Sequence, residues 1–116
     1  NDRPPGVFIG GREWHSDEAL VLVSRSFAID REALGAALQN PGAGYVGMIG
    51  SRKKIRQVFS DLEKEGASRE AFDQVRAPIG LDIRADSPAE IAVSVIAEVL
   101  SVLRGGTGCP LTDRNR

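Results

Sequence analysis

The sequence predicts an α/β domain built around a small, mostly parallel sheet. Two short apolar runs, at residues 19–23 and 45–49, have the pattern of strands that are buried on both faces. Amphipathic segments with helical spacing follow each of these runs, and a further helical segment lies near the end of the chain. Strands that alternate with helices in this way pair in parallel through right-handed crossover connections.

Composition places the chain among ordinary globular proteins. It has 116 residues, of which 41% are hydrophobic and 27% are charged, which is enough for one core and argues against disorder. The net charge of -1 argues against a nucleic acid as the main partner, because such proteins usually carry a basic excess. No apolar run reaches the roughly 18 residues of a membrane span, and the single cysteine, Cys109, fits a reducing compartment. We therefore expect a cytoplasmic protein.

The first half of the chain divides into segments with recognisable ends. The N-terminal residues are rich in Gly, Pro and charge, with room for a short strand only at Val7-Phe8-Ile9. The first long helix is expected to have Asp30 as its N-cap and to run to about Gln39. The second follows the strand at residues 45–49 and ends at Gly66. Its apolar residues have i, i+3, i+4, i+7 spacing: Ile55, Val58, Phe59 and Leu62.

The last helix has the clearest boundaries. Ser87-Pro88-Ala89-Glu90 combines an N-cap, a proline at the first helical position and a capping-box glutamate, and Gly105-Gly106 ends the helix. Before it, a short helix is expected from Ser68 to about Arg76, and residues 78–83 fit a strand or an ordered loop. The predicted organisation has three parts, an irregular segment, a domain and a flexible tail, at residues 1–18, 19–105 and 106–116.

The turn after the second strand is the strongest candidate for a binding site. Helix N-termini favour acidic residues by about 0.3–1 kcal/mol per charge, yet this helix opens with basic residues and ends with acidic ones. Its free backbone N–H groups, the Ser51 hydroxyl and the Arg52 and Lys53 side chains would converge on a phosphate. Gly47 and Gly50 would let the backbone approach such a ligand closely. A solvated basic face beside a tight turn is the alternative, and the residues alone leave both interpretations open.

Other candidate residues give weaker signals. His15 and Cys109 lack the partners that a catalytic site or a metal site needs, so no catalytic or metal-binding residue is predicted. Asp82 follows Gly80 in a loop expected at the ligand edge and is a candidate for a polar contact. On the last helix a polar stripe predicts the solvent edge of a packed helix, with paired carboxylates as the alternative: Glu90, Ser94, Glu98 and Ser101. The breadth of apolar surface on the same helix suggests a helix–helix contact in a homodimer.

Three segments resemble the XdhC/CoxI family, the xanthine dehydrogenase accessory proteins. They are YVGMIGSRKK at residues 45–54, APIGLDI at residues 77–83 and SPAEIAVSVIAE at residues 87–98. Their order and spacing match, and the resemblance extends over about residues 19–105. It implies a three-layer Rossmann-like domain with a small, mostly parallel sheet. The family's domain opens with a glycine-rich βα unit that no segment here matches, so this first unit is expected to be absent.

The resemblance also implies a function. Proteins of this family are thought to bind the molybdenum cofactor, assist its sulfuration and deliver it to xanthine dehydrogenase or a related molybdenum hydroxylase. It therefore implies a maturation factor rather than a catalyst. A phosphate of molybdopterin, or the pyrophosphate of its dinucleotide, would then lie at residues 50–53. The loop at residues 78–82, which includes Gly80 and Asp82, would form a second wall of the site.

Two further hypotheses stay open at this point. A regulatory or oxidoreductase domain that binds NAD or NADP fits the alternation of strands and helices, although the G-x-G-x-x-G fingerprint is absent. A dimerisation module without a ligand site is the third. The three hypotheses differ in the ligand that the folded protein should bind: the molybdenum cofactor, a nicotinamide nucleotide, or neither.

Overall fold

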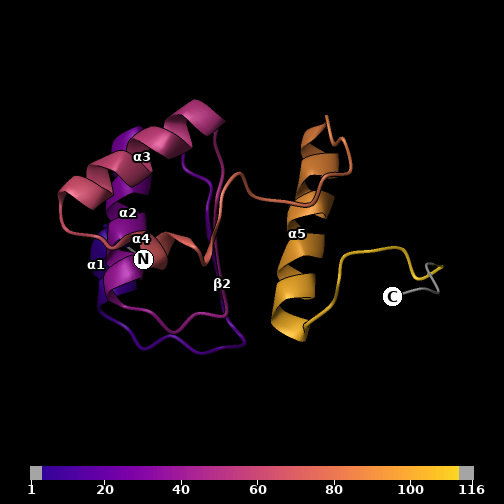
Figure 1. Ribbon diagram of the computed structural model, residues 1–116, viewed down its shortest axis with the longest axis horizontal. Helices are drawn as coiled ribbons and strands as arrows, with labels where there is room; N and C mark the ends of the chain where they lie inside the picture. The colour runs from indigo at the N-terminus through magenta and orange to yellow at the C-terminus, as the bar shows by residue number, and fades with distance from the viewer. Residues whose placement is uncertain (1–3, 113–116) are drawn as a thin grey trace. The chain divides into compact units, whose positions relative to one another are not determined.

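The computed structural model describes residues 4–112 and contains a three-stranded sheet with helices (Figure 1). The chain divides into two compact parts, with the division between Ile79 and Gly80. The first part contains the sheet and four helices. In chain order its elements are α1 (Pro5–Gly10), β1 (Ala19–Leu22), α2 (Phe27–Gln39), β2 (Tyr45–Met48), α3 (Arg52–Lys64), α4 (Arg69–Phe72) and β3 (Val75–Arg76). The second part contains α5 (Pro88–Arg104).

The sheet is parallel throughout and its strands lie in the order β1-β2-β3. Ala19 pairs with Tyr45 and Leu22 with Met48, so β1 and β2 run side by side over their whole length. One residue further on, the Ile49 N–H donates a hydrogen bond to the Leu22 carbonyl at 2.9 Å. The carboxyl ends of β1 and β2 therefore lie next to each other. The predicted α/β class and the small parallel sheet are confirmed.

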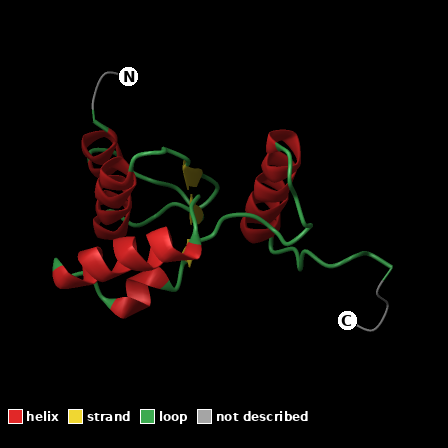
Figure 2. Ribbon diagram, turned by 90° about the horizontal axis from the view of Figure 1, so that it is seen from above, coloured by secondary structure: helices red, strands yellow, loops and turns green. Residues whose placement is uncertain are grey.

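The core of the first part lies between the sheet and its helices. The helices α1 to α4 lie on one side of the strands in both views (Figures 1 and 2). Each fully buried aliphatic side chain in such a layer contributes about 1.5–3 kcal/mol. The Phe59 and Phe72 rings stack at 4.4 Å between centroids, which ties α4 to α3. The buried apolar residues are Ile9, Leu22, Ala33, Leu34, Ala37, Met48, Ile55, Val58 and Leu62.

The start, the buried face and the end of α3 follow from local sequence signals, as predicted. Ser51 is the N-cap, and its hydroxyl oxygen accepts a hydrogen bond from the Lys54 N–H at 3.1 Å. The predicted apolar spacing places Ile55, Val58 and Leu62 in the core. The helix ends at Lys64, two residues before Gly66, which has a φ of 109°.

Three other local predictions are wrong. The helix α2 begins at Phe27 because the Ser26 side chain accepts from the Ile29 N–H, so Asp30 lies inside the first turn and is not the N-cap. Residues 7–9 are helical, since Pro5 opens α1 with its fixed φ. The helix after Ser68 is only Arg69–Phe72, and residues 75–76 instead pair with β2. In that last case pairing with the sheet has overridden local preference.

In the second part, α5 has the predicted boundaries. Ser87 and Glu90 form the capping box, Pro88 is at the first helical position, and Gly105 ends the helix with a φ of 73°. The predicted solvent edge is wrong, however. Ser94 and Glu98 are the buried residues of α5, whereas several of its large apolar residues are exposed: Ile91, Val93, Ile96 and Leu100.

The buried polar residues of α5 form hydrogen bonds with the backbone of the loop that begins the second part of the chain. The Ser94 hydroxyl donates to the Leu81 carbonyl at 2.7 Å, and a Glu98 carboxylate oxygen accepts from the Gly80 N–H at 3.0 Å. This loop has no strand neighbour among the described residues, so helix side chains partner its backbone groups. That requirement explains why Ser94 and Glu98, two of the four residues of the polar stripe, lie inward.

Candidate functional site

Two strand-to-helix connections lie at the carboxyl edge of the sheet. Residues 23–26 join β1 to α2, and residues 49–51 join β2 to α3. Both helices have a serine N-cap, Ser26 and Ser51, in extended backbone conformation. The edge beyond the carboxyl ends of parallel strands is where open α/β sheets bind ligands, because helix N-termini with free N–H groups meet there.

The shape of the second connection depends on Gly50. Its φ of 145° lies in a region that L side chains rarely adopt, and a Cβ built there would lie 2.9 Å from Lys54 Cδ. Glycine therefore allows the chain to leave β2 and enter α3 within three residues. Ser51 then caps α3, so the predicted strand-to-helix turn is present in the fold.

Arg52 and Lys53 occupy the first two positions of α3 and are exposed. Within residues 4–112 neither side chain makes an ion pair or a hydrogen bond. The first turn of the helix contains no acidic residue. Two free cations therefore lie beside N–H groups that have no intrahelical partner, an arrangement that attracts an anion.

Lys54, the third basic residue, is different. Its Nζ donates to an Asp30 carboxylate oxygen at 2.8 Å, and the Asp30 side chain is only 1% exposed. This pair was not predicted from the sequence. A signal was nevertheless present, because Asp30 precedes Ala33 and Leu34 by three and four residues and so lies on the apolar face of its helix. An acidic residue on that face needs a buried partner.

Gly47, in the middle of β2, provides space for the protein's own side chains. A Cβ at this position would lie 2.6 Å from the Tyr45 hydroxyl oxygen and 2.8 Å from Ile79 Cδ1. The Tyr45 side chain therefore occupies the space beside Gly47. Close approach of a ligand to the Gly47 backbone stays a prediction.

The two remaining predicted residues belong to the second part of the chain. Gly80 has a φ of 106°, its N–H donates to Glu98, and a Cβ there would collide with the Ser94 hydroxyl. Asp82 is exposed. Both residues precede α5, whereas the turn at residues 50–53 belongs to the first part. The second wall of the site, which would need Gly80 and Asp82, stays a prediction.

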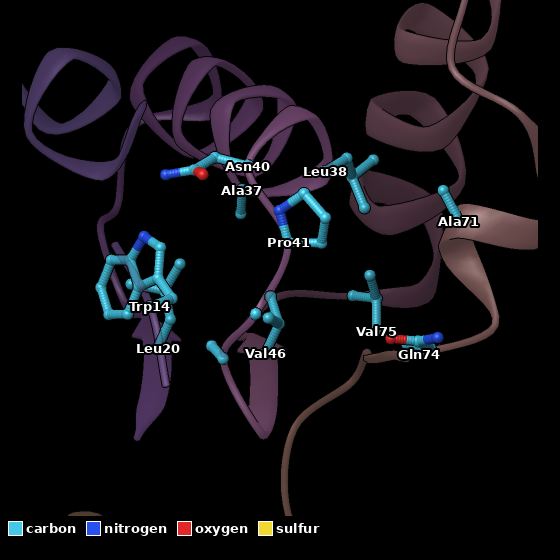
Figure 3. A pocket seen from close by; sticks show the side chains of 12 residues that line it. Trp14, Leu20, Ala37, Leu38, Asn40, Pro41, Val46, Ala71, Gln74 and Val75 are labelled. Carbon is cyan, nitrogen blue, oxygen red and sulfur yellow. The ribbon is translucent and has the colours of Figure 1, made fainter. Parts of the chain in front are cut away.

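A cavity of about 220 Å³ lies elsewhere in the first part of the chain. Figure 3 shows Trp14 and Leu20 on one side of it and Ala71 and Val75 on the other. The Trp14 ring is fixed by its N–H bond to the Ile9 carbonyl at 3.0 Å. No charged side chain lines this cavity, and none of the predicted site residues does. We therefore regard the turn at residues 50–53 as the better candidate for binding an anion.

Two carboxylates with lowered pKa values lie outside the turn. Hydrogen bonds from the Arg12 side chain and the His15 backbone N–H lower the pKa of Glu18. Hydrogen bonds from the Asp86 and Ser87 backbone N–H groups lower the pKa of Glu90. Both sets of bonds are local, and Glu90 belongs to the capping box, so both groups stabilise structure.

Two classes of site have no support among residues 4–112. No group of three or more His, Cys, Asp or Glu side chains there is arranged to hold a metal ion. In the same range, no helix has the length and apolar character needed to cross a membrane.

Parallel strands joined by helices, with a basic helix N-terminus at their carboxyl edge, define a Rossmann-type α/β domain. The model of the XdhC Rossmann domain matches residues 2–99, and the chain belongs to this family. The resemblance seen in the sequence is thereby confirmed.

Two proteins of Escherichia coli (strain K12) are similar in sequence. The molybdenum cofactor insertion chaperone PaoD is 33% identical over 87 residues, which are 75% of this chain and 27% of PaoD. The uncharacterized protein YqeB is 38% identical over 79 residues, which are 68% of this chain and 14% of YqeB.

A crystal structure described as a xanthine dehydrogenase from Bacillus halodurans is similar in fold, with a TM-score of 0.71 and 26% sequence identity. The match covers 89% of this chain and 28% of that one. The chain thus spans less than a third of the length of each of these relatives.

Proposed function

We propose that this chain acts in maturation of the molybdenum cofactor, as the domain that holds a phosphate of the cofactor. The observation that carries the proposal is the turn at residues 50–53, where Arg52 and Lys53 are exposed and free of ion pairs within residues 4–112. Membership of the XdhC family supports it. So does the similarity to PaoD, which is named a molybdenum cofactor insertion chaperone.

The chemistry of the turn fits a phosphate. The guanidinium of Arg52 can donate two parallel hydrogen bonds to phosphate oxygens, and the Lys53 ammonium adds a second positive charge. The Arg52 and Lys53 backbone N–H groups, at the first two helical positions, are free of intrahelical bonds. Ser51 already accepts from the Lys54 N–H, but its hydroxyl hydrogen is available to a ligand oxygen.

In this proposal the chain binds and transfers the cofactor and does not react with it. The groups at the turn are cations and hydrogen-bond donors, which hold an anion without changing it. The finer parts of the proposal are the client, a molybdenum hydroxylase of the xanthine dehydrogenase type, and assistance in sulfuration. The proposal also includes a cytoplasmic location and a homodimer formed through α5. Gly80 and Asp82 would contact the cofactor from the second part of the chain.

Co-elution of the cofactor with the purified chain tests the proposal. The wild type would be compared with the R52E/K53E double variant, with the bound pterin measured by its fluorescence after oxidation and molybdenum by elemental analysis. The matched control is K64E/R104E, which makes the same change of charge at two exposed positions away from the turn that form no ion pair within residues 4–112. We expect retention by the wild type and the control, and loss in R52E/K53E.

Two results would count against the proposal. Equal retention by R52E/K53E would remove the turn from cofactor binding. No retention by the wild type under reducing, anaerobic conditions would remove cofactor binding by this chain.

A thermal-shift measurement with NAD and NADP tests the alternative, a domain that binds a nicotinamide nucleotide. A ligand at 100 times its dissociation constant stabilises a protein by about 2.7 kcal/mol, so such a ligand would raise the unfolding temperature measurably.

A further inference from the structure

A buried acidic residue and a basic residue connect the two helices that begin at the ligand edge. Asp30 lies in the first turn of α2, and Lys54 lies in the first turn of α3. Their 2.8 Å bond joins the helices directly behind the turn at residues 50–53. The Lys54 side chain is 21% exposed, so the pair is close to solvent although Asp30 itself is buried.

The Lys54 side chain is held along its length. Its backbone N–H donates a hydrogen bond to the Ser51 hydroxyl oxygen. Its Cδ lies close to the position that a Cβ would occupy at Gly50. Its Nζ ends at Asp30. Without Asp30, the same lysine would add a third positive charge next to Arg52 and Lys53.

We propose that Asp30 sets the charge of the anion-binding turn by neutralising Lys54, so that the turn presents two cations to its ligand and not three. This inference rests on the proposed function, since it concerns the same turn. It makes Asp30 and Lys54 positioning residues, while Arg52 and Lys53 contact the ligand. A site with two effective positive charges matches a phosphate group with about two negative charges, such as a phosphate monoester or a pyrophosphate diester.

Charge arithmetic at the turn gives opposite expectations for the two single variants. Counting Arg52, Lys53, Lys54 and Asp30, the wild type has a local charge of about +2. D30N raises it to about +3 and D30N/K54M returns it to about +2. K54M lowers it to about +1 when the Asp30 carboxyl keeps its charge without its partner. A purely structural pair would behave differently, because either single change would weaken binding by damaging the turn.

The test measures dissociation constants for inorganic phosphate and pyrophosphate by calorimetry, with the full chain at one ionic strength. We expect D30N to bind pyrophosphate roughly threefold more tightly and K54M roughly threefold more weakly, as for the loss or gain of one partly exposed charge. D30N/K54M should bind as the wild type does, and K54R should keep wild-type affinity. Circular dichroism establishes that each variant is folded. If one single variant fails to fold, the other single variant compared with the double variant tests the inference.

The outcomes separate this inference from the proposal on which it rests. If R52E/K53E abolishes phosphate binding while D30N, K54M and the double variant all bind as the wild type does, the role of Asp30 is wrong and the turn remains the site. If both single variants bind more weakly, or the double variant does not regain affinity, the pair is structural only. If the wild type binds neither anion, both the site and the role of Asp30 are wrong. Synthetic monoester and diester probes, phenyl phosphate and ADP-ribose, distinguish the two kinds of phosphate.

Discussion

The N-termini of α3 and α5 have the same backbone geometry and opposite chemistry. Ser51 and Ser87 are both N-caps, with φ of -69° and -76° and ψ of 159° and 157°. Each hydroxyl accepts from the N–H three residues on, at 3.1 Å and 3.2 Å. The residue at that third position differs, because it is Lys54 in α3 and Glu90 in α5.

That one position directs the two helix starts to different partners. Glu90 turns back to the N-cap and accepts from the Ser87 and Asp86 N–H groups, so a side chain of α5 itself satisfies the N–H groups at and just before its N-cap. Lys54 instead reaches across to Asp30 on α2, which leaves the first turn of α3 open to solvent and next to two cations. One helix start is closed by its own side chain, and the other is left open to solvent.

The largest expected effect comes from Gly50, the residue that makes the open start possible. G50A should lower the free energy of unfolding by about 2 kcal/mol, because alanine is strained at a φ of 145°. Urea denaturation measures the change. The matched variant before the other cap, D86A, alters an exposed side chain and should stay within about 0.5 kcal/mol of the wild type. Equal effects of the two variants would contradict the special geometry of the turn.

The two serine caps should differ in their contribution to stability. S87A removes one bond and disturbs the capping box, whereas S51A removes a single cap bond, so losses of about 1.5 and 1 kcal/mol are expected. Urea denaturation of each variant, together with amide exchange in α3 and α5, locates the loss. A larger loss for S51A would mean that the open helix start also supports the core.

A charge reversal at Arg52 should separate stability from binding. R52E places an acidic residue at a helix N-terminus, so it should raise the free energy of unfolding by about 0.5 kcal/mol while it weakens the binding of phosphate. Thermal unfolding and calorimetry with phosphate measure the two effects on one sample. A variant that is less stable and still binds phosphate would contradict the view that binding explains the basic start of α3.

The smallest expected effect is the loss, at low pH, of the stability that Glu90 gives to the start of α5. Because the bonds from Asp86 and Ser87 lower the pKa of Glu90, its contribution to stability is present above the ordinary value of 4.5 and is lost as the pH falls through the lower value in the folded chain. The protection factors of the amides at the start of α5, which are corrected for the intrinsic pH dependence of exchange, should therefore fall in acid, and the Glu90 carboxyl should titrate below 4.5 by NMR. E90Q should remove the pH dependence of these protection factors, and its persistence would assign that dependence to another group.

Much of the fold could be predicted because its signals are local. The runs at residues 19–23 and 45–49 contain β1 and β2, and the spacing of Ile55, Val58 and Leu62 gives the buried face of α3. The turn at Gly50 and Ser51 was also predicted, since a glycine and a capping serine act through the adjacent backbone. One prediction was wrong because a distant segment decided the outcome, as for Val75 and Arg76, which become a strand only by pairing with β2. Two others were wrong because a competing local signal was stronger, namely the Ser26 cap and Pro5.

By itself, the sequence determined where α3 and α5 begin and end and which turn contains the unpaired cations. Caps, glycines and apolar spacing act within a few residues, so they can be read from the chain. Tertiary structure alone decided which polar groups are buried, namely Asp30 with Lys54, and Ser94 and Glu98 with the loop at Gly80 and Leu81. The physical reason is that burial depends on which segments meet, and a buried charge or N–H needs a partner that the local sequence does not contain.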